Sequence, residues 1–160
     1  MKNHPLINPI TNKEEWISRA IASFAIVLGI HESNKYVLAV TRGEGTPDPE
    51  FIGKWCLPCG YLDFDETIKQ SISREVFEET GMNINPDNWE CIYMNDEPSA
   101  DKRQNVVFGF KTVIEDIDAW ELSDIASEPD EVSDIQWIPV KEIDNLEWAF
   151  NHKEILGILV

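Results

Sequence analysis

One predicted helix carries acidic residues on the face that its apolar residues assign to the interior. Three apolar side chains recur at every fourth position of residues 65–80, the spacing of one helical face: Ile68, Ile72 and Val76. At about 100° per residue, Glu79 projects between Ile68 and Ile72, and Glu75 lies about 60° from the middle of the apolar stripe. A solvated acidic face would lie on the opposite side of the helix. The pattern therefore indicates that these carboxylates have a role other than solubility.

Carboxylates that share a buried face need a counter-charge. Glu78 lies on the flank of the stripe, about 120° from its middle, and follows Glu75 at i+3. Burial of several like charges is costly unless cations neutralise them or some carboxylates are protonated. Hard divalent cations prefer oxygen ligands, so the spacing predicts a metal site. Arg74, directly before the cluster, is placed to hold one carboxylate by charge-assisted hydrogen bonds.

The rest of the chain predicts a mixed β-sheet around this helix. Residues 21–31 and 36–42 read as a hairpin, and further strands are expected at 89–94, 105–114 and 132–138. Exposed loops are expected over 43–53, 96–103 and 115–129.

Helix signals complete the expected fold. Thr11 and Glu14 have the spacing of a capping box, which predicts a short helix over 11–20, and Gly81 is expected to end the central helix. Two helical pieces, 140–145 and 151–159, are expected at the C-terminus. With 160 residues and no long linker, we expect a single domain, 1–160, of the α/β class: a mixed sheet in an α/β/α sandwich.

The charge balance limits the partners. Thirteen Lys and Arg against thirty Asp and Glu give a formal net charge of -17, which repels polyanions and predicts that the chain has no nucleic-acid polymer as a partner. A small phosphorylated substrate remains compatible if divalent cations screen its approach. The longest apolar run, 20–30, is too short to span a bilayer, so we expect no membrane partner.

The absence of a visible secretion signal and the small number of cysteines predict a cytoplasmic location. No secretion signal is visible, and the three cysteines are expected to be reduced thiols in the cytoplasm. Cys56 and Cys59 form a C-x-x-C pair without a second pair, and we interpret them as incidental, with zinc binding or redox chemistry as the alternatives.

Residues 60–82, GYLDFDETIKQSISREVFEETGM, resemble the Nudix box, G-x5-E-x7-R-E-U-x-E-E-x-G-U, in which U is apolar. All nine defined positions are filled: Gly60, Glu66, Arg74, Glu75, Val76, Glu78, Glu79, Gly81 and Met82. Such a long match at fixed spacing is far more specific than a short motif. The flanking segments 54–58 and 135–139 also resemble the family. Cys59 and Asp65 stand where glycine is common, which leaves the loop conformation open.

The resemblance implies a Nudix fold and a metal-dependent hydrolase. It implies that Glu75, Glu78 and Glu79 ligate Mg²⁺ or Mn²⁺, with the carbonyl of Gly60 as a further ligand. Arg74 would orient Glu75, and Glu66 would brace the start of the helix. Water would attack a phosphorus of a diphosphate linkage, and bound metal would activate the water and neutralise charge on the bridging oxygen.

The resemblance leaves the general base open between a box glutamate and an acid from a separate loop. The loop candidates are Glu128, Asp130 and Glu131, of which Glu131 is preferred because it directly precedes a predicted strand. Asp96 and Glu97 are rivals.

Pro98, sixteen residues after Met82, resembles the ADP-ribose pyrophosphatase branch. Phe150-Asn151-His152 resembles the Phe-Asp-His start of a last helix seen in related branches. They favour a nucleoside diphosphate linked to a sugar, with nucleoside triphosphates as the main alternative. Side chains that could stack on a base are Phe51, Trp55, Trp89 and Phe150, although aromatic residues chiefly fill cores. Arg42 and Arg103 could meet phosphates or merely solvate loops.

Two other classes of function compete with catalysis. Loss of Glu75 or Glu79 would have favoured a non-catalytic Nudix-type nucleotide sensor, and neither residue is lost. The about twenty residues after Trp137 are expected to leave no room for the added DNA-binding domain of such regulators. An acidic calcium-buffering module would bind metal without turnover. The resemblance is also compatible with a homodimer.

Overall fold

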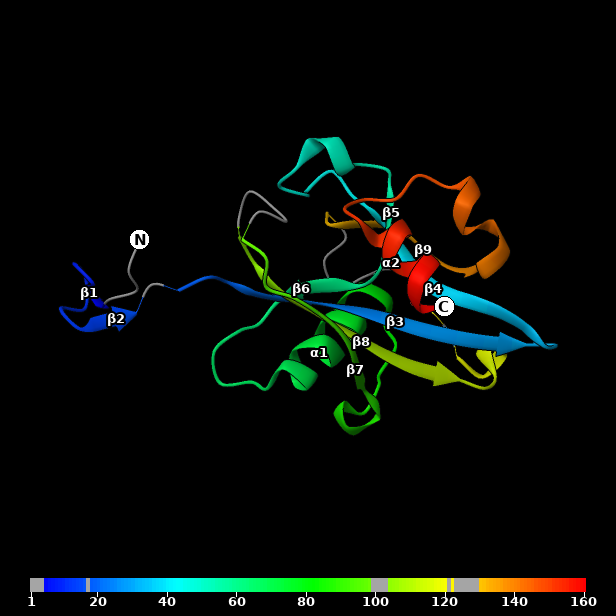
Figure 1. Ribbon diagram of the computed structural model, residues 1–160, viewed down its shortest axis with the longest axis horizontal. Helices are drawn as coiled ribbons and strands as arrows, with labels where there is room; N and C mark the ends of the chain where they lie inside the picture. Colours follow the sequence, from blue (N-terminus) through cyan, green and yellow to red (C-terminus); the bar gives the residue numbers. More distant parts are fainter. Residues whose placement is uncertain (1–4, 17, 99–103, 121, 123–129) are drawn as a thin grey trace.

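A mixed seven-stranded sheet forms the centre of the fold in a computed structural model that describes residues 5–16, 18–98, 104–120, 122 and 130–160. Its main path contains five strands in spatial order: β5 (Trp55–Cys56), β4 (Asn34–Arg42), β3 (Ile21–His31), β8 (Val106–Ile114) and β7 (Glu90–Asn95). Two strands pair off this path: β6 (Cys59–Tyr61) with β3, and β9 (Val132–Pro139) with β4. Figure 1 shows helical segments on both sides of the sheet, as the predicted α/β/α sandwich requires.

The central strand β3 explains the two layers. It runs parallel to β8 and antiparallel to β4 and β6, so it is covered along both edges. Alternate side chains of a strand point to opposite faces. Phe24 and Ile26 belong to the core cluster that contains residues of the C-terminal helix, whereas Ala25 and Val27 belong to the cluster that contains the central helix. The continuous apolar run in β3 therefore reflects burial on both faces.

The central helix α1 (Ile68–Thr80) begins later than expected. Thr67 is its N-cap, and a capping box joins Thr67 to Gln70, whose side chain accepts from the Thr67 amide at 2.8 Å. Asp65 has φ 67°, a left-handed conformation that excludes it from a right-handed helix, so the predicted start at residue 65 is wrong. Gly81, with φ 74°, caps the C-terminus as predicted.

The C-terminal layer contains the two helical pieces that the sequence predicts. They are a 3₁₀ helix, Val140–Asn145, and α2 (His152–Leu159). Ile155 and Leu156 of α2 pack with Ile143 and Phe24 in one buried cluster. No helix in the described parts of the chain is long and apolar enough to cross a membrane.

The prediction of a helix over 11–20 is wrong. β1 (Pro5–Ile7) and β2 (Glu14–Trp16) form an antiparallel hairpin, which stands apart from the sheet in Figure 1. The side chain of Asn8 accepts from the amides of Ile10 at 2.8 Å and Thr11 at 3.1 Å. The turn thereby takes the Thr11 amide, which the predicted capping box would have paired with Glu14.

The loop predictions are partly tested. The 43–53 loop contains one 3₁₀ turn, Pro49–Phe51, and two further 3₁₀ turns occur at Pro86–Asn88 and Ile117–Ala119. Most of 96–103 and much of 115–129 lie outside the described residues. The turn between β3 and β4 is tighter than expected, because Glu32 and Ser33 both have positive φ, the conformation of a two-residue hairpin turn.

Candidate functional site

The acidic residues of α1 are buried in the order that the helical projection predicts. Glu79 is 4% exposed. The side chains of Glu75 and Glu78 are 14% and 31% exposed. The residue nearest the apolar stripe is therefore the most buried, and the flanking residue is the most accessible.

Arg74 gathers three carboxylates at the start of this cluster. Its Nη1 donates to Glu75 Oε1 at 2.7 Å and to Glu78 Oε2 at 2.9 Å, so oxygens of both acids lie within hydrogen-bond distance of one cationic nitrogen. Its Nε and Nη2 donate to Glu66. Hydrogen bonds to Glu66 raise the pKa of Arg74 and, despite some burial, lower the pKa of Glu66. Arg74 and Glu66 are therefore both charged at neutral pH.

Glu66 also fixes the loop before the helix. Its Oε1 accepts from the Asp63 amide at 2.9 Å, while Arg74 Nη2 donates to the carbonyl of Tyr61 at 3.0 Å. These contacts join the loop to α1, which is the geometry that the predicted bracing role of Glu66 requires.

Gly60 lies directly against Glu75. A Cβ added at Gly60 would meet the Cδ of Glu75 at 2.1 Å and both of its oxygens at 2.2 Å. Residue 60 must lack a side chain for the Glu75 carboxylate to occupy its position. The contact supplies a steric reason for glycine at the first position of the motif.

Glu79 is held from two directions. The amide of Cys59 donates to its Oε2 at 3.1 Å, and Arg42 Nη1 lies 3.8 Å from its Oε1. Burial raises the pKa of Glu79 well above its usual value, and Cys59 and Glu75 add to this effect. Arg42 and the Cys59 amide oppose it without reversing it. Additional positive charge beside this carboxylate would favour its ionised form.

Arg42 was expected to meet phosphates or solvate a loop, and the structure contradicts both expectations. It is 7% exposed and forms hydrogen bonds with Thr46 as well as the ion pair with Glu79. Arg42 lies outside the box and far from Glu79 in sequence, so residue spacing carried no signal for this ion pair. Arg103 lies outside the described residues.

Two groups of candidate bases lie at the end of the sheet where β6 pairs with β3. Glu131 immediately precedes Val132, which pairs with Arg42 of β4. Asp96 follows β7, and its carbonyl accepts from Arg19 at 2.7 Å. Asp130 and Glu97 neighbour these two acids, whereas Glu128 lies outside the described residues. Glu131 stays the predicted base, and Asp96 and Glu97 stay its rivals.

The aromatic candidates divide by exposure. Trp89 is 2% exposed and donates to Ser73, so it belongs to the core and cannot stack on a substrate. Phe150 is 45% exposed and packs against Phe51 with ring centroids 4.6 Å apart. Trp55 is partly buried in the core cluster beside α2.

His152 begins α2 and is buried. Its Nδ1 accepts from the Leu57 amide at 3.0 Å. Burial and the charge of Arg42 lower the pKa of His152 to about 3, so the ring is neutral at physiological pH. Pro98, the residue whose position resembles the ADP-ribose pyrophosphatase branch, lies in a turn after β7.

The two cysteines of the C-x-x-C pair are free thiols, as is Cys91. Hydrogen bonding to Cys56 and burial raise the pKa of Cys59 well above its usual value. This disfavours the thiolate, which is the form that attacks oxidants and binds metals. The environment is consistent with incidental cysteines, although the Cys59 amide contacts Glu79.

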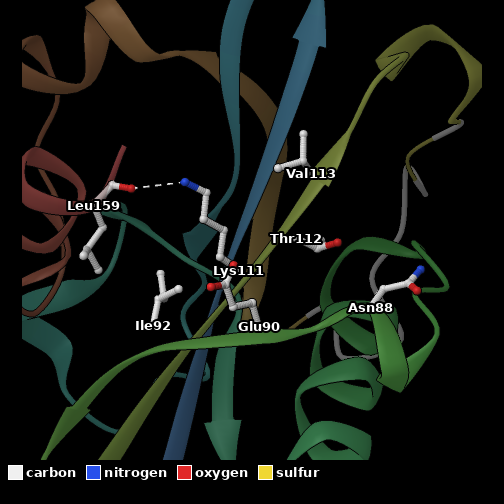
Figure 2. A pocket seen from close by; sticks show the side chains of 7 residues that line it. All are labelled: Asn88, Glu90, Ile92, Lys111, Thr112, Val113 and Leu159. Carbon is white, nitrogen blue, oxygen red and sulfur yellow. Dashed lines mark hydrogen bonds between the residues drawn. The ribbon is translucent and has the colours of Figure 1, made fainter.

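A separate groove of about 510 Å³ lies beside β7 and β8 (Figure 2). Lys111 extends across it and donates to the carbonyl of Leu159 at 3.3 Å. None of the predicted site residues lines this groove. The candidate site is therefore the carboxylate cluster at α1.

The donor set fits a divalent cation by its chemistry. Among the described residues, no group of three or more His, Cys, Asp or Glu side chains is arranged, as it stands, to hold a metal ion. Arg74 instead holds Glu75 and Glu78, and protein donors face both oxygens of Glu79. The acids nevertheless present carboxylate oxygens from adjacent turns, and a cation would favour the ionised form of buried Glu79.

Comparison with known proteins identifies a family. The NUDIX domain model matches residues 20–157. A MutT-like protein from Streptomyces ambofaciens is 29% identical over 86 residues, which cover 54% of this chain and 51% of that protein. NAD-capped RNA hydrolase NudC from Haemophilus influenzae is 26% identical over 113 residues, which cover 71% of this chain and 38% of that protein. The chain thus spans about half or less of the length of these relatives.

Solved structures agree with this match. The NUDIX domain of Shewanella oneidensis NrtR complexed with ADP ribose has a TM-score of 0.71 and 25% identity, covering 94% of this chain and 89% of that chain. A bifunctional NMN adenylyltransferase/ADP ribose pyrophosphatase from Francisella tularensis, complexed with AMP and a Mn ion, has a TM-score of 0.69 and 28% identity, covering 89% and 41%. The predicted Nudix fold is confirmed.

One similar structure bears on the predicted absence of a nucleic-acid partner. NrtR complexed with a 27mer DNA has a TM-score of 0.64 and 26% identity, covering 86% of this chain and 58% of that chain. The comparisons therefore do not support excluding nucleic acid, and the exclusion stays a prediction from net charge.

Proposed function

Because the chain belongs to the NUDIX domain family, we propose that it is a Mg²⁺- or Mn²⁺-dependent hydrolase of a pyrophosphate linkage in a nucleoside diphosphate derivative. The observation that carries the proposal is the burial of Glu79 beside Glu75 and Glu78 on one helix. Like-charged carboxylates are gathered in this way where cations use them.

The ligands that would hold the metal come from two adjacent segments. Glu75, Glu78 and Glu79 would supply carboxylates from α1, and Gly60 of β6, which lies against Glu75, would supply its carbonyl. When bound, the metal would activate water and neutralise charge on the bridging oxygen. A Mn ion in the similar Francisella tularensis structure supports a divalent cofactor here.

The remaining residues would organise these ligands. Arg74 contacts Glu75 and Glu78 and would set their orientation, while Glu66 holds Arg74 to the start of the helix. We propose Glu131 as the base that takes a proton from the attacking water, since it lies on a different element at the same end of the sheet. Such a base would work beside the metal ligands without displacing them.

The substrate class is inferred from chemistry and from similar proteins. ADP ribose is bound by the NrtR NUDIX domain, and the Francisella tularensis protein is named an ADP ribose pyrophosphatase. These neighbours favour ADP-ribose or a nucleotide sugar. A nucleoside triphosphate is the alternative that the MutT-like relative favours.

A non-catalytic nucleotide sensor is the second candidate function. The observation that favours it is the similarity to NrtR, which has been solved both with ADP ribose and with a 27mer DNA. The NrtR NUDIX domain also covers more of this chain than the Francisella tularensis pyrophosphatase does. The intact acid set favours catalysis. A cytoplasmic, homodimeric state and an exclusively small-molecule partner stay predictions.

Turnover of a compound panel separates the two functions. The panel contains ADP-ribose, nucleotide sugars, dinucleoside polyphosphates, NAD and nucleoside triphosphates, each assayed with Mg²⁺ and with excess chelator. We expect nucleoside monophosphate from ADP-ribose or a nucleotide sugar only when Mg²⁺ is present. Metal-dependent binding by calorimetry without product from any compound would identify a sensor and contradict hydrolysis.

A further inference from the structure

A buried arginine, Arg42, lies at the end of β4 and pairs with Glu79 of the candidate site. Arg42 is 7% exposed, its amide donates to the Lys54 carbonyl at 3.0 Å, and its carbonyl accepts from the Gly53 amide at 2.9 Å. It also pairs with Val132 of β9, next to an irregularity in the register. These backbone contacts fix where the side chain begins.

Thr46 directs the guanidinium. Its Oγ1 accepts from Arg42 Nε at 3.2 Å and from Nη2 at 2.8 Å, and Thr46 is itself 7% exposed. This two-point contact leaves Nη1 on the side of Glu79, 3.8 Å from Oε1, with both side chains below 10% exposure: 8% for Arg42 and 5% for Glu79. A planar fork held at two nitrogens limits where the third can lie.

The same loop holds the segment that carries Glu131. The Gly43 amide donates to the Glu131 carbonyl at 2.6 Å, and the Gly45 amide donates to the Asp130 carbonyl at 2.6 Å. A Cβ at Gly43 would lie 2.5 Å from the Asp130 oxygen, and a Cβ at Gly45 would lie 2.8 Å from it. The two glycines permit this close approach of backbone to backbone.

The pKa of Arg42 is affected both by Glu79 and by Glu131. Burial acts to lower the pKa of Arg42, but the neighbouring Cys56, Cys59, Glu79 and Glu131 act to raise it, and the net direction is upward. The guanidinium therefore interacts electrostatically with one acid of the box and with one acid outside it.

From this geometry we propose that Arg42, oriented by Thr46, is a positioning residue that sets Glu79 relative to the Glu131 segment. The inference rests on the proposed function, because the two acids are a metal ligand and a base in that proposal. Arg42 acts through these acids and does not touch the substrate. Loosening its fork is expected to misplace the Glu79 carboxylate without changing the charge of the site.

Two substitutions of Thr46 separate orientation from packing. Thr46→Val keeps the branched shape but removes the acceptor of the Arg42 fork, whereas Thr46→Ser keeps the acceptor and removes one methyl group. The affinity for Mn²⁺, measured by electron paramagnetic resonance in the absence of substrate, is the first readout. We expect affinity about tenfold weaker for Thr46→Val and within about twofold of wild type for Thr46→Ser.

Steady-state kinetics on the best wild-type substrate provide the second readout. Thr46→Val is expected to lower kcat about tenfold while KM changes less than about twofold. If Thr46→Val is unfolded at the assay temperature, Arg42→Lys provides the same test, because it keeps the positive charge and lacks the fork. Wild-type Mn²⁺ affinity and wild-type kcat in either folded variant would overturn the positioning role.

The two proposals fail in different ways. A wild-type protein that binds Mn²⁺ but hydrolyses no compound contradicts the proposed function, and the comparison of metal affinities still decides the role of Arg42. A wild-type protein that hydrolyses its substrate while Thr46→Val and Thr46→Ser behave alike contradicts only the positioning role. Absence of any Mn²⁺ binding by wild type contradicts both.

Discussion

Glu66 and Arg74 form a two-point ion pair across the start of α1. Arg74 donates from Nε to Oε2 at 3.2 Å and from Nη2 to Oε1 at 2.9 Å, so both oxygens of Glu66 are engaged. The opposite end of the guanidinium holds Glu75 and Glu78. The pair therefore connects the loop before the helix to the acids proposed as metal ligands.

Replacing Glu66 tests that connection. Glu66→Gln keeps the size of the side chain but removes the charge that fixes Arg74, and we expect kcat to fall about tenfold. Because the pair is partly exposed, the expected loss of unfolding free energy is about 1 kcal/mol or less. The matched control is Asp63→Asn, because Asp63 is 77% exposed and 3.9 Å from Arg74. Equal activity in the two variants would contradict the bracing role.

A methyl group at residue 60 tests the contact with Glu75. Gly60 has an ordinary backbone conformation, so Gly60→Ala is compatible with the fold, and the end of the flexible Glu75 side chain must move instead. We expect a folded protein with Mn²⁺ affinity at least about tenfold weaker. Thermal unfolding and metal titration measure the two effects.

Gly157→Ala is the matched control for Gly60→Ala. A Cβ at Gly157, an exposed position in α2, would meet nothing within 4 Å. The control should keep metal affinity and gain about 0.5–1 kcal/mol of stability from helix propensity. Unchanged metal affinity in Gly60→Ala would contradict the assigned role of Glu75.

The pH dependence of stability tests the neutral, buried His152. Its pKa is lowered to about 3 in the folded protein, below the ordinary value of 6.5, so the unfolded chain binds the proton first as pH falls. The contribution of His152 to the free energy of unfolding is therefore complete above about pH 6.5 and decreases as pH falls toward 3, by up to about 1.4 kcal/mol per pH unit.

Glu79 affects stability in the opposite direction. Because its pKa is raised in the folded protein, its contribution to stability is present at low pH and is lost as pH rises.

His152→Gln isolates the histidine from Glu79. Glutamine retains an acceptor for the Leu57 amide but does not titrate in this range. Urea unfolding at pH 7.5, 6.5 and 5.5 should show a smaller decrease in stability for the variant than for wild type below pH 6.5. Parallel curves would show that His152 binds its proton equally in the folded and unfolded protein, which would contradict its lowered pKa.

The part of the fold that followed from sequence is the part governed by periodicity. The stripe of Ile68, Ile72 and Val76 predicted which face of α1 is buried, and the same angles predicted the exposure order of its acids. Gly81 ended the helix as expected, because a left-handed cap requires little beyond its own conformation.

Two predictions of helix position from local residue patterns were wrong. The spacing of Thr11 and Glu14 predicted a helix. The structure instead has a hairpin, in which the Asn8 side chain accepts hydrogen bonds from two turn amides. Asp65 adopted positive φ, which shifted the start of α1 to Ile68. Such outcomes depend on small differences in turn energy that residue spacing does not encode.

The contacts of Glu79 depended on tertiary structure. Arg42 and the Cys59 amide reach this carboxylate from β4 and β6, and neither belongs to a motif that marks it as a partner. Pairing of β4 with β9 also brings the Glu131 segment to this end of the sheet. These relationships could be found only after the strands were assembled.

Substitution of Glu79 tests the central claim most directly. Glu79→Gln preserves the acceptor for the Cys59 amide while removing the charge proposed to bind metal, and Glu154→Gln removes an exposed acid from α2 as a control. With saturating Mg²⁺ and the best substrate of the panel, we predict that kcat falls about 1,000-fold in Glu79→Gln, or about 4 kcal/mol of transition-state stabilisation, and is unchanged in the control. A folded Glu79→Gln protein with the kcat of wild type would contradict metal-dependent hydrolysis at this cluster.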